Sequence, residues 1–241
     1  MPLYRDRGVV VRTFKLGEAD RIAVLVTRDN GKVRAVVKGA RKTRSRLGAR
    51  LEPLRHVDVQ LNRGRGDLDV VTGAQTLDRW PHLRSDLDRL AKAMTLAEAA
   101  DQAGLERRAD PALYEMLRGA LAELDRHDAA LLVPAFLLKL LAHEGVAPQL
   151  DACVAGPGCD DDGRPVAVDA ALGGVVCEEH RRGRTSSPAT IGLLRAVLGG
   201  GLRAALDVPS SAETAEVAAV VNGLWEYQME RSLRSRDLLD H

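Results

Sequence analysis

The sequence predicts an α+β protein: a small N-terminal barrel of five strands, followed by an α-helical domain with a cysteine-containing loop inserted in it. Apolar residues alternate with polar ones over much of the first 80 residues, but recur every three to four residues after Trp80. The charge changes at the same place. Residues 1–80 hold eighteen Lys or Arg against nine Asp or Glu, a net charge of +9, and the remainder carries −8. We therefore expect a basic domain at residues 1–80 and an acidic domain at residues 81–241.

The overall composition sets limits on the class of protein. Because 45% of the residues are hydrophobic, the chain has enough apolar side chains for a core and is not disordered throughout. No run approaches the roughly 18 apolar residues of a membrane helix, and the N-terminus lacks a signal-peptide pattern. We expect a cytoplasmic protein without a membrane partner, in which three cysteines are more suited to metal binding or packing than to disulfides.

Five apolar runs rich in β-branched residues predict the strands of the barrel, at residues 8–14, 21–27, 32–37, 54–61 and 68–76. Turn signals separate them, including Asn30-Gly31 and the Gly-rich segment 62–66. Five short antiparallel strands in about 75 residues suit an OB-fold, with an SH3-like barrel as the alternative.

Helical segments are predicted at residues 83–96, from 110, at 128–145, at 188–198 and from 210 onward. Asp110-Pro111 has the pattern of a helix start, and residues 210–213 offer a capping box. Pro134 is expected to kink or divide the third helix, which is almost wholly apolar. Residues 148–186 are expected to form a loop-rich insertion.

A basic connection joins the third and fourth predicted strands. Between residues 32 and 50 there is no acidic residue, and we expect the eight cations of this stretch to contact the phosphates of a nucleic acid: Lys32, Arg34, Lys38, Arg41, Lys42, Arg44, Arg46 and Arg50. Gly39, Ser45 and Gly48 are expected to give the backbone freedom. A solvated loop is the alternative interpretation.

Sequence-specific base recognition is not indicated. No recognition-helix pattern accompanies the cations, and the only aromatic rings in the barrel segment are Tyr4 and Phe14. We therefore expect binding that is led by phosphate contacts and strongly dependent on salt.

A metal site is predicted in the insertion, from the series Cys153-(x5)-Cys159-(x17)-Cys177-(x2)-His180. Three thiolates and one imidazole are the ligands of a closed tetrahedral structural Zn²⁺ site. The first pair is spaced more loosely than the usual two residues. The alternative is an eroded site in which Cys153 and Cys177 pack as small hydrophobic residues.

Patterns of catalytic sites are otherwise missing. The sequence has no GxxxxGK[ST] loop, no GxSxG elbow and no HExxH motif, and Glu18 and Asp20 are too isolated to propose as a carboxylate pair. We expect a protein without enzymatic activity. A protein-interaction adaptor that does not bind DNA is the main alternative, and a zinc-dependent nuclease is a minor one, because a complete Cys3His set leaves no position for an activated water.

Four motifs follow one another along the chain: Leu16-Gly17-Glu18-Ala19-Asp20-Arg21-Ile22, then Lys38-Gly39-Ala40-Arg41-Lys42, the run 136–141, and Gly-x-x-Pro-x-Leu-x-x-Cys at residues 145–153. Their identity and order resemble those of the RecO family of bacterial recombination mediators, and the resemblance spans essentially the whole chain. The departures are the five-residue spacing after Cys153 and a histidine, His180, where the family has its last cysteine.

The resemblance implies an N-terminal OB-fold that binds DNA and a helical domain that carries a zinc finger in many members. Such proteins bind single- and double-stranded DNA and anneal complementary strands. They also work with RecR to load RecA onto single strands coated with single-strand-binding protein, which implies these proteins as partners and a nucleoid-associated location. The acidic helical domain is expected to contact protein partners.

Overall fold

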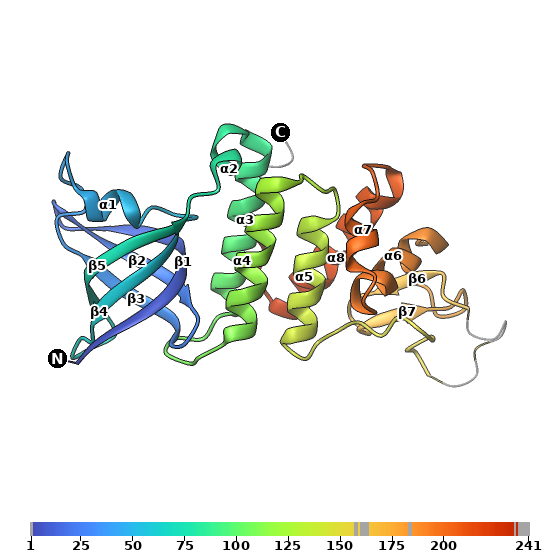
Figure 1. Ribbon diagram of the computed structural model, residues 1–241. Helices are drawn as coiled ribbons and strands as arrows, with labels where there is room; N and C mark the ends of the chain where they lie inside the picture. The colour runs from blue at the N-terminus through green and yellow to red at the C-terminus, as the bar shows by residue number, and fades with distance from the viewer. Residues whose placement is uncertain (1, 157–158, 160–163, 183–184, 234, 236–241) are drawn as a thin grey trace. The chain divides into compact units, whose positions relative to one another are not determined.

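The computed structural model describes residues 2–156, 159, 164–182, 185–233 and 235 (Figure 1). These residues form two compact units. The first comprises residues 1–126 together with Ser235, and the second begins at His127. The first unit therefore contains the barrel and also the helices up to Arg126. No helix among the described residues is long and apolar enough to cross a membrane.

The N-terminal barrel is built from five strands, β1 (Leu3–Leu16), β2 (Asp20–Thr27), β3 (Gly31–Val37), β4 (His56–Asn62) and β5 (Asp69–Asp78). The order around the closed barrel is β1-β2-β3-β5-β4, and all pairs are antiparallel except β3 with β5. A short helix, α1 (Arg46–Arg50), lies between β3 and β4 in the sequence (Figure 1). This topology is that of the OB-fold, and the predicted fold class is confirmed.

Alternation of apolar and polar residues fills the barrel interior. Along β3 every second residue, from Gly31 to Val37, is buried. The core of buried side chains is completed from the other strands and α1, and includes Val10, Leu25, Val33, Leu51, Val57, Val59 and Leu61. Each such Val or Leu contributes about 1.5–3 kcal/mol to folding.

Strand β1 is longer than the sequence predicts. Its first half, Tyr4-Arg5-Asp6-Arg7, is charged and hides the strand pattern, but Asp6 is buried and accepts a hydrogen bond of 2.7 Å from Asn30 Nδ2 in the β2–β3 turn. A bulge between Val10 and Arg12 bends the strand. The two halves of β1 can therefore pair with different strands, β4 and β2, which closes the barrel.

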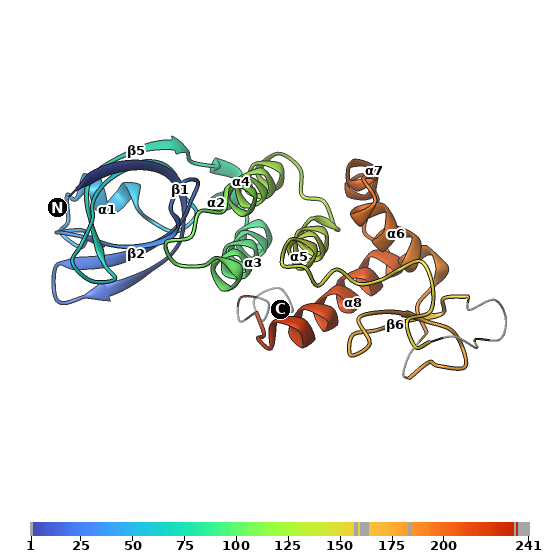
Figure 2. The same cartoon turned by 90° about the horizontal axis from the view of Figure 1, so that it is seen from below.

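Three helices complete the first unit: α2 (Pro81–Ser85), α3 (Leu87–Ala103) and α4 (Pro111–Arg126). Helices α3 and α4 lie side by side, and both also pack against β1 (Figures 1 and 2). Asp110 caps α4 as predicted, accepting from Leu113 N at 2.9 Å. The single helix predicted at 83–96 is wrong: it is divided at Asp86, whose side chain caps α3 by accepting from Arg89 N at 3.0 Å.

A buried histidine contributes to the packing of these helices on the barrel. His56, on β4, lies 2.6 Å from Asp78 Oδ2 through Nδ1 and 2.8 Å from the Tyr114 hydroxyl on α4 through Nε2. The ring of Trp80 stacks against it, with centroids 6.0 Å apart. Burial lowers the pKa of His56, and the hydrogen bond to Asp78 only partly opposes this.

The second unit contains α5 (Leu132–His143), β6 (Ala167–Asp169), β7 (Gly174–Val176), α6 (Pro188–Leu198), α7 (Leu202–Leu206) and α8 (Ala212–Met229). Helix α5 lies beside α8, and the strands β6 and β7 form a small hairpin within the predicted insertion (Figure 2). The helix at 188–198 is confirmed with the predicted bounds.

Two details of the predicted helices in this unit are wrong. Pro134 neither kinks nor divides α5, because the helix begins at Leu132 and the proline lies in its first turn, where its missing N–H would have no partner inside the helix. The capping box of α8 lies one residue later than predicted: Ser211 accepts from Thr214 N at 3.3 Å, and Thr214 Oγ1 accepts from Ser211 N at 2.8 Å.

Candidate nucleic-acid interface and metal centre

The basic segment, defined here as residues 38–50, is held by its backbone against the turn between β1 and β2. Gly39 N donates to Asp20 Oδ1 at 2.7 Å, and Arg41 N donates to Ala19 O at 2.9 Å. The guanidinium of Arg41 also donates to Gly17 O at 3.0 Å. Three hydrogen bonds to one short turn fix the start of the segment in place.

Helix α1 (Arg46–Arg50) forms the C-terminal part of the basic segment. Ser45 caps the helix by accepting from Gly48 N at 3.0 Å. Gly48 packs on the backbone of Ala40, since a Cβ at this position would lie 2.2 Å from the Ala40 carbonyl oxygen. The expectation that Gly39, Ser45 and Gly48 give backbone freedom is therefore wrong: they form a turn, a helix cap and a close backbone contact.

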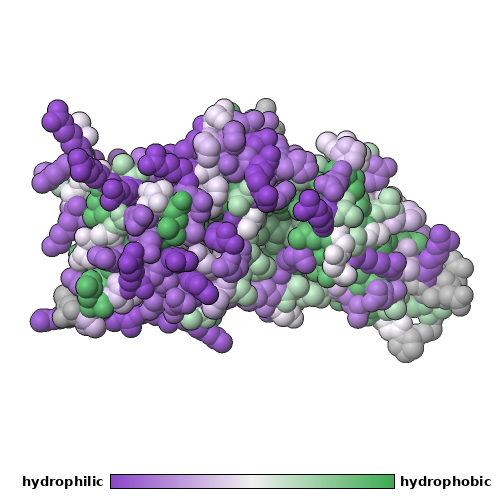
Figure 3. All heavy atoms as spheres, viewed as in Figure 1, coloured by the Kyte–Doolittle hydropathy of each residue, from purple (hydrophilic) through white to green (hydrophobic). Residues whose placement is uncertain are grey.

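The cations of the basic segment are on its surface. All are exposed, and none forms an ion pair with a residue that the structure describes: Lys38, Arg41, Lys42, Arg44, Arg46 and Arg50. Arg50 uses one guanidinium nitrogen to reach Ala74 O at 2.7 Å. Figure 3 shows hydrophilic side chains projecting from the side of the barrel that carries α1. An ordered backbone thus presents six positive charges to solvent.

Lys32 and Arg34, the two other predicted DNA contacts, lie on β3 outside this segment. Lys32 Nζ donates to the Asp101 carbonyl oxygen at 2.7 Å and lies 3.5 Å from its carboxylate, and its side chain is only 15% exposed. Arg34 is 3.8 Å from the carboxylate of Glu106. Both cations face acidic partners in the same unit, so they differ from the six cations of the basic segment.

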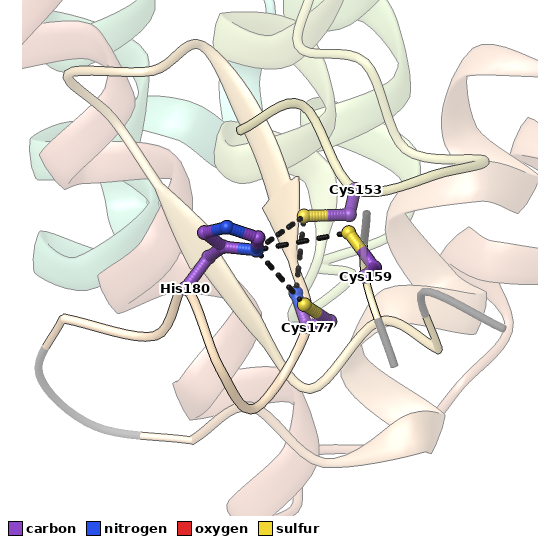
Figure 4. Close-up of side chains that lie close together, drawn as sticks. All are labelled: Cys153, Cys159, Cys177 and His180. Atoms are coloured by element: carbon purple, nitrogen blue, oxygen red, sulfur yellow. Dashed lines mark hydrogen bonds between the residues drawn. The ribbon is translucent and has the colours of Figure 1, made fainter. Parts of the chain in front are cut away.

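The side chains of the predicted metal site converge in the second unit (Figure 4). Nδ1 of His180 lies 3.7 Å from the Sγ of Cys153, 3.7 Å from that of Cys159 and 3.2 Å from that of Cys177. All four atoms are within 4.8 Å of one another. A tetrahedral Zn²⁺ with bonds of about 2.3 Å to sulfur and 2.0–2.1 Å to nitrogen requires S···N separations of about 3.6 Å. The cluster can hold a metal ion of this kind.

Backbone pairing brings these ligands together. Val175 N donates to Gln149 O at 2.8 Å and Val154 N donates to Val175 O at 2.9 Å, so the segment that carries Cys153 runs along β7. Gly174 permits this close approach, because a Cβ there would lie 2.4 Å from Gln149 O. Cys177 follows β7 directly, and the next turn carries His180.

Hydrogen bonds within the cluster shift the pKa values of Cys153 and Cys159 in opposite directions. Burial disfavours the thiolate of Cys153, but hydrogen bonds from the backbone N–H groups of Ala155 and Cys177 outweigh it and lower the pKa of Cys153 to about 7. The hydrogen bond to Cys153, together with burial, raises the pKa of Cys159 to about 12. A metal ion bound here would stabilise thiolates, because its positive charge offsets their mutual repulsion.

Family comparisons cover nearly the whole chain. The model of the recombination protein O N-terminal domain matches residues 1–80, and that of the recombination protein O C-terminal domain matches residues 84–237. The chain belongs to the RecO family. Membership places it among DNA repair and recombination mediators, and it agrees with the resemblance found in the sequence. The end of the N-terminal match at residue 80 lies where the charge and the hydrophobic period change.

The sequence gives no role to Asp20, although it holds the start of the basic segment. A lone carboxylate beside a turn has no recognisable pattern, and its partner, Gly39, lies 19 residues away.

Proposed function

We propose that this RecO-family protein binds single- and double-stranded DNA through the basic segment and anneals complementary strands. The observation that carries the proposal is the set of six surface cations on an anchored backbone, none of them neutralised by a described acidic side chain. Each phosphate that a cation neutralises releases counterions, so six contacts give a salt slope of about −4 on single strands and about −5 on duplex DNA.

Annealing follows from the same charges. Two complementary strands repel each other as polyanions, and a surface that neutralises part of both lowers the cost of bringing them together. Because the backbone of the basic segment is anchored, the adjustment to each strand comes from the long, exposed Lys and Arg side chains. Readout of base sequence is not required for this step.

The metal cluster serves as a structural site for Zn²⁺ in this proposal. Cys153, Cys159, Cys177 and His180 would hold the ion, which would supply a cross-link between the segment along β7 and the turn that follows it. Four protein ligands complete a tetrahedral set and leave no position for a reactive water. Elemental analysis of the purified protein should find about one zinc per chain, and a value near zero without chelator treatment would contradict this assignment.

Protein partners are proposed from family membership. RecR and single-strand-binding protein would act with this chain, and RecA would be loaded as a consequence on the coated strand. A mediator of this kind works in the cytoplasm, at the nucleoid, because its substrate is chromosomal DNA. The acidic helical region is the part that we assign to protein contacts, since its net negative charge disfavours DNA.

The test compares two variants that lose the same charge. In the first, Lys38, Arg41, Lys42 and Arg44 are replaced by Ala. In the control, four cations outside the basic segment are replaced by Ala: Arg118, Arg126, Lys139 and Arg203. Fluorescence anisotropy with labelled single-stranded and duplex oligonucleotides should show a loss of at least tenfold for the first variant only, and its annealing activity should disappear.

Unchanged binding by the first variant would contradict the proposal. If the wild-type protein binds neither oligonucleotide at low or moderate salt, the alternative of a protein-interaction adaptor replaces it. Equal losses in both variants would mean that net charge, and not the basic segment, attracts the DNA.

A further inference from the structure

A groove of about 590 Å³ opens beside the basic segment, within the first unit. Its wall residues come from β1, β2, the turn after α1, α2 and α3: Thr13, Phe14, Lys15, Arg21, Glu52, Pro53, Leu54, Arg84, Leu90 and Met94. The volume lies in the range of about 300–1,000 Å³ that is usual for binding sites of small groups. Apolar side chains form much of the groove, and charged side chains accompany them.

Phe14 is the aromatic ring of this groove, and 42% of its surface is exposed. An exposed aromatic ring offers a flat apolar face on which a planar ligand can stack. The guanidinium of Arg12 lies 4.8 Å from the centroid of the ring, and Arg12 Nε is held at 2.8 Å by the carboxylate of Asp101 on α3. The ring is therefore supported from one side by an anchored cation and is pre-organised for a second planar partner.

The charged wall residues are mainly basic. Lys15, Arg21 and Arg84 face one acid among the lining residues, Glu52, and its carboxylate is already 3.1 Å from Arg84 Nη1. The groove thus retains a positive excess after this pair is counted. An apolar ring next to uncompensated cations complements a ligand that is itself part planar and part anionic.

Two connections link the groove to the basic segment: a set of hydrogen bonds and a short stretch of chain. The turn that follows Lys15 accepts the hydrogen bonds from Gly39 and Arg41. Glu52 and Pro53 follow α1 after a single residue. A polyanion bound along the basic segment would therefore pass the mouth of the groove.

We propose that a nucleobase of single-stranded DNA enters this groove and stacks on Phe14, while Lys15 and Arg21 contact the neighbouring phosphates. This inference rests on the proposed function. A base in a duplex is already stacked and paired, so moving it onto the ring would cost the free energy of unstacking and unpairing. A base in a single strand can reach the ring without most of this cost. Phe14 thereby adds a preference for single strands that the basic segment, which contacts only phosphates, does not provide.

The experiment replaces Phe14 by Ala and by Tyr, with Leu3→Ala as the matched control. Leu3 is an exposed apolar residue at the opposite end of β1, so its loss removes a comparable surface away from the groove. Stacking of one base is worth about 1–3 kcal/mol, so Phe14→Ala should weaken single-strand binding by roughly five- to 150-fold. Duplex binding and the salt slope should stay unchanged, and Phe14→Tyr should bind like the wild type.

A second readout locates the base directly. Irradiation of the wild-type complex with a single-stranded oligonucleotide that carries 5-iodouracil should cross-link the peptide that contains Phe14, as detected by mass spectrometry. Leu3→Ala should give the same cross-link.

Three results would overturn the inference. They are single-strand binding by Phe14→Ala equal to that of the wild type, an equal loss of single-strand and duplex binding, and occupation of the groove by an acidic peptide with an apolar end that leaves DNA binding intact. In each of these cases, the proposed function would still be supported as long as the wild-type protein binds duplex DNA. Failure of the wild type to bind any DNA would instead remove both.

Discussion

The basic segment lies between β3 and β4, and the metal cluster is formed by residues that precede β6 or follow β7. The two direct their side chains in opposite ways. In the basic segment, hydrogen bonds to Gly17, Ala19 and Asp20 fix the chain and leave the cationic side chains exposed. In the metal cluster, pairing with β7 fixes the backbone and the three thiols and one imidazole point toward one another. This difference in side-chain direction indicates which kind of ligand each region can bind. Charges that face solvent are suited to an external polyanion, and converging sulfur and nitrogen atoms are suited to an enclosed cation.

The largest effect is expected from breaking the metal cluster. Replacing Cys177, which is almost fully buried, by Ser removes one ligand of the proposed Zn²⁺ site, and structural zinc contributes on the order of 10 kcal/mol in zinc-finger peptides. Thermal unfolding followed by calorimetry should show a strongly destabilised second unit, with the single-strand affinity within about twofold of the wild type. Glu178→Gln, beside Cys177 but outside the ligand set, is the control and should unfold like the wild type. Lost DNA affinity in Cys177→Ser would show that the two segments do not act separately.

An intermediate effect is expected at Lys32, the cation that differs from those of the basic segment. Lys32→Met removes its hydrogen bond to the Asp101 carbonyl and its contact with the carboxylate, which should lower the free energy of unfolding by about 1–3 kcal/mol. Urea denaturation measures this loss, and Lys42→Met should unfold almost like the wild type. The reverse order of stabilities would contradict the distinction between paired and surface cations.

The smallest effect is expected in the pH dependence of stability. The pKa of His56 is lowered by burial, so the unfolded chain takes up a proton near pH 6.5 before the folded chain does. Neutral His56 therefore stabilises the fold fully above about pH 6.5, and this contribution is lost as the pH falls toward the lowered pKa. His56→Gln should flatten the decline in stability between pH 7 and pH 5, measured by urea denaturation at each pH. If the free energy of unfolding declines equally with pH in the wild type and in His56→Gln, then His56 is not the cause of the decline.

Much of the fold could be predicted from the sequence because local patterns determine it. The alternation from Gly31 to Val37 and the Pro188 start of α6 are signals that the structure preserves. Helix α1 was beyond such reasoning, since five residues carry no hydrophobic period and the contact between Gly48 and Ala40 is tertiary. Asp86 likewise ends one helix and caps the next in a stretch whose leucine spacing is continuous.

The candidate sites divide in the same way. The Cys and His ligands could be listed from their residue types, but the loose spacing between Cys153 and Cys159 becomes compatible with one cluster only after the distant pairing with β7. The groove could not be predicted at all, because Phe14, Arg21 and Arg84 come from separate segments that only the folded barrel and its helices bring together. Nor could the sequence separate Lys32 from its neighbours, since its partner Asp101 is 69 residues away.

The salt dependence of single-strand binding tests the central claim most directly. A plot of log Kobs against log salt should have a slope of about −4 for the wild-type protein, and the variant lacking Lys38, Arg41, Lys42 and Arg44 should be less steep by about 3. The variant lacking Arg118, Arg126, Lys139 and Arg203 should keep the wild-type slope. Equal slopes in all three proteins would contradict the assignment of the basic segment as the surface that contacts DNA.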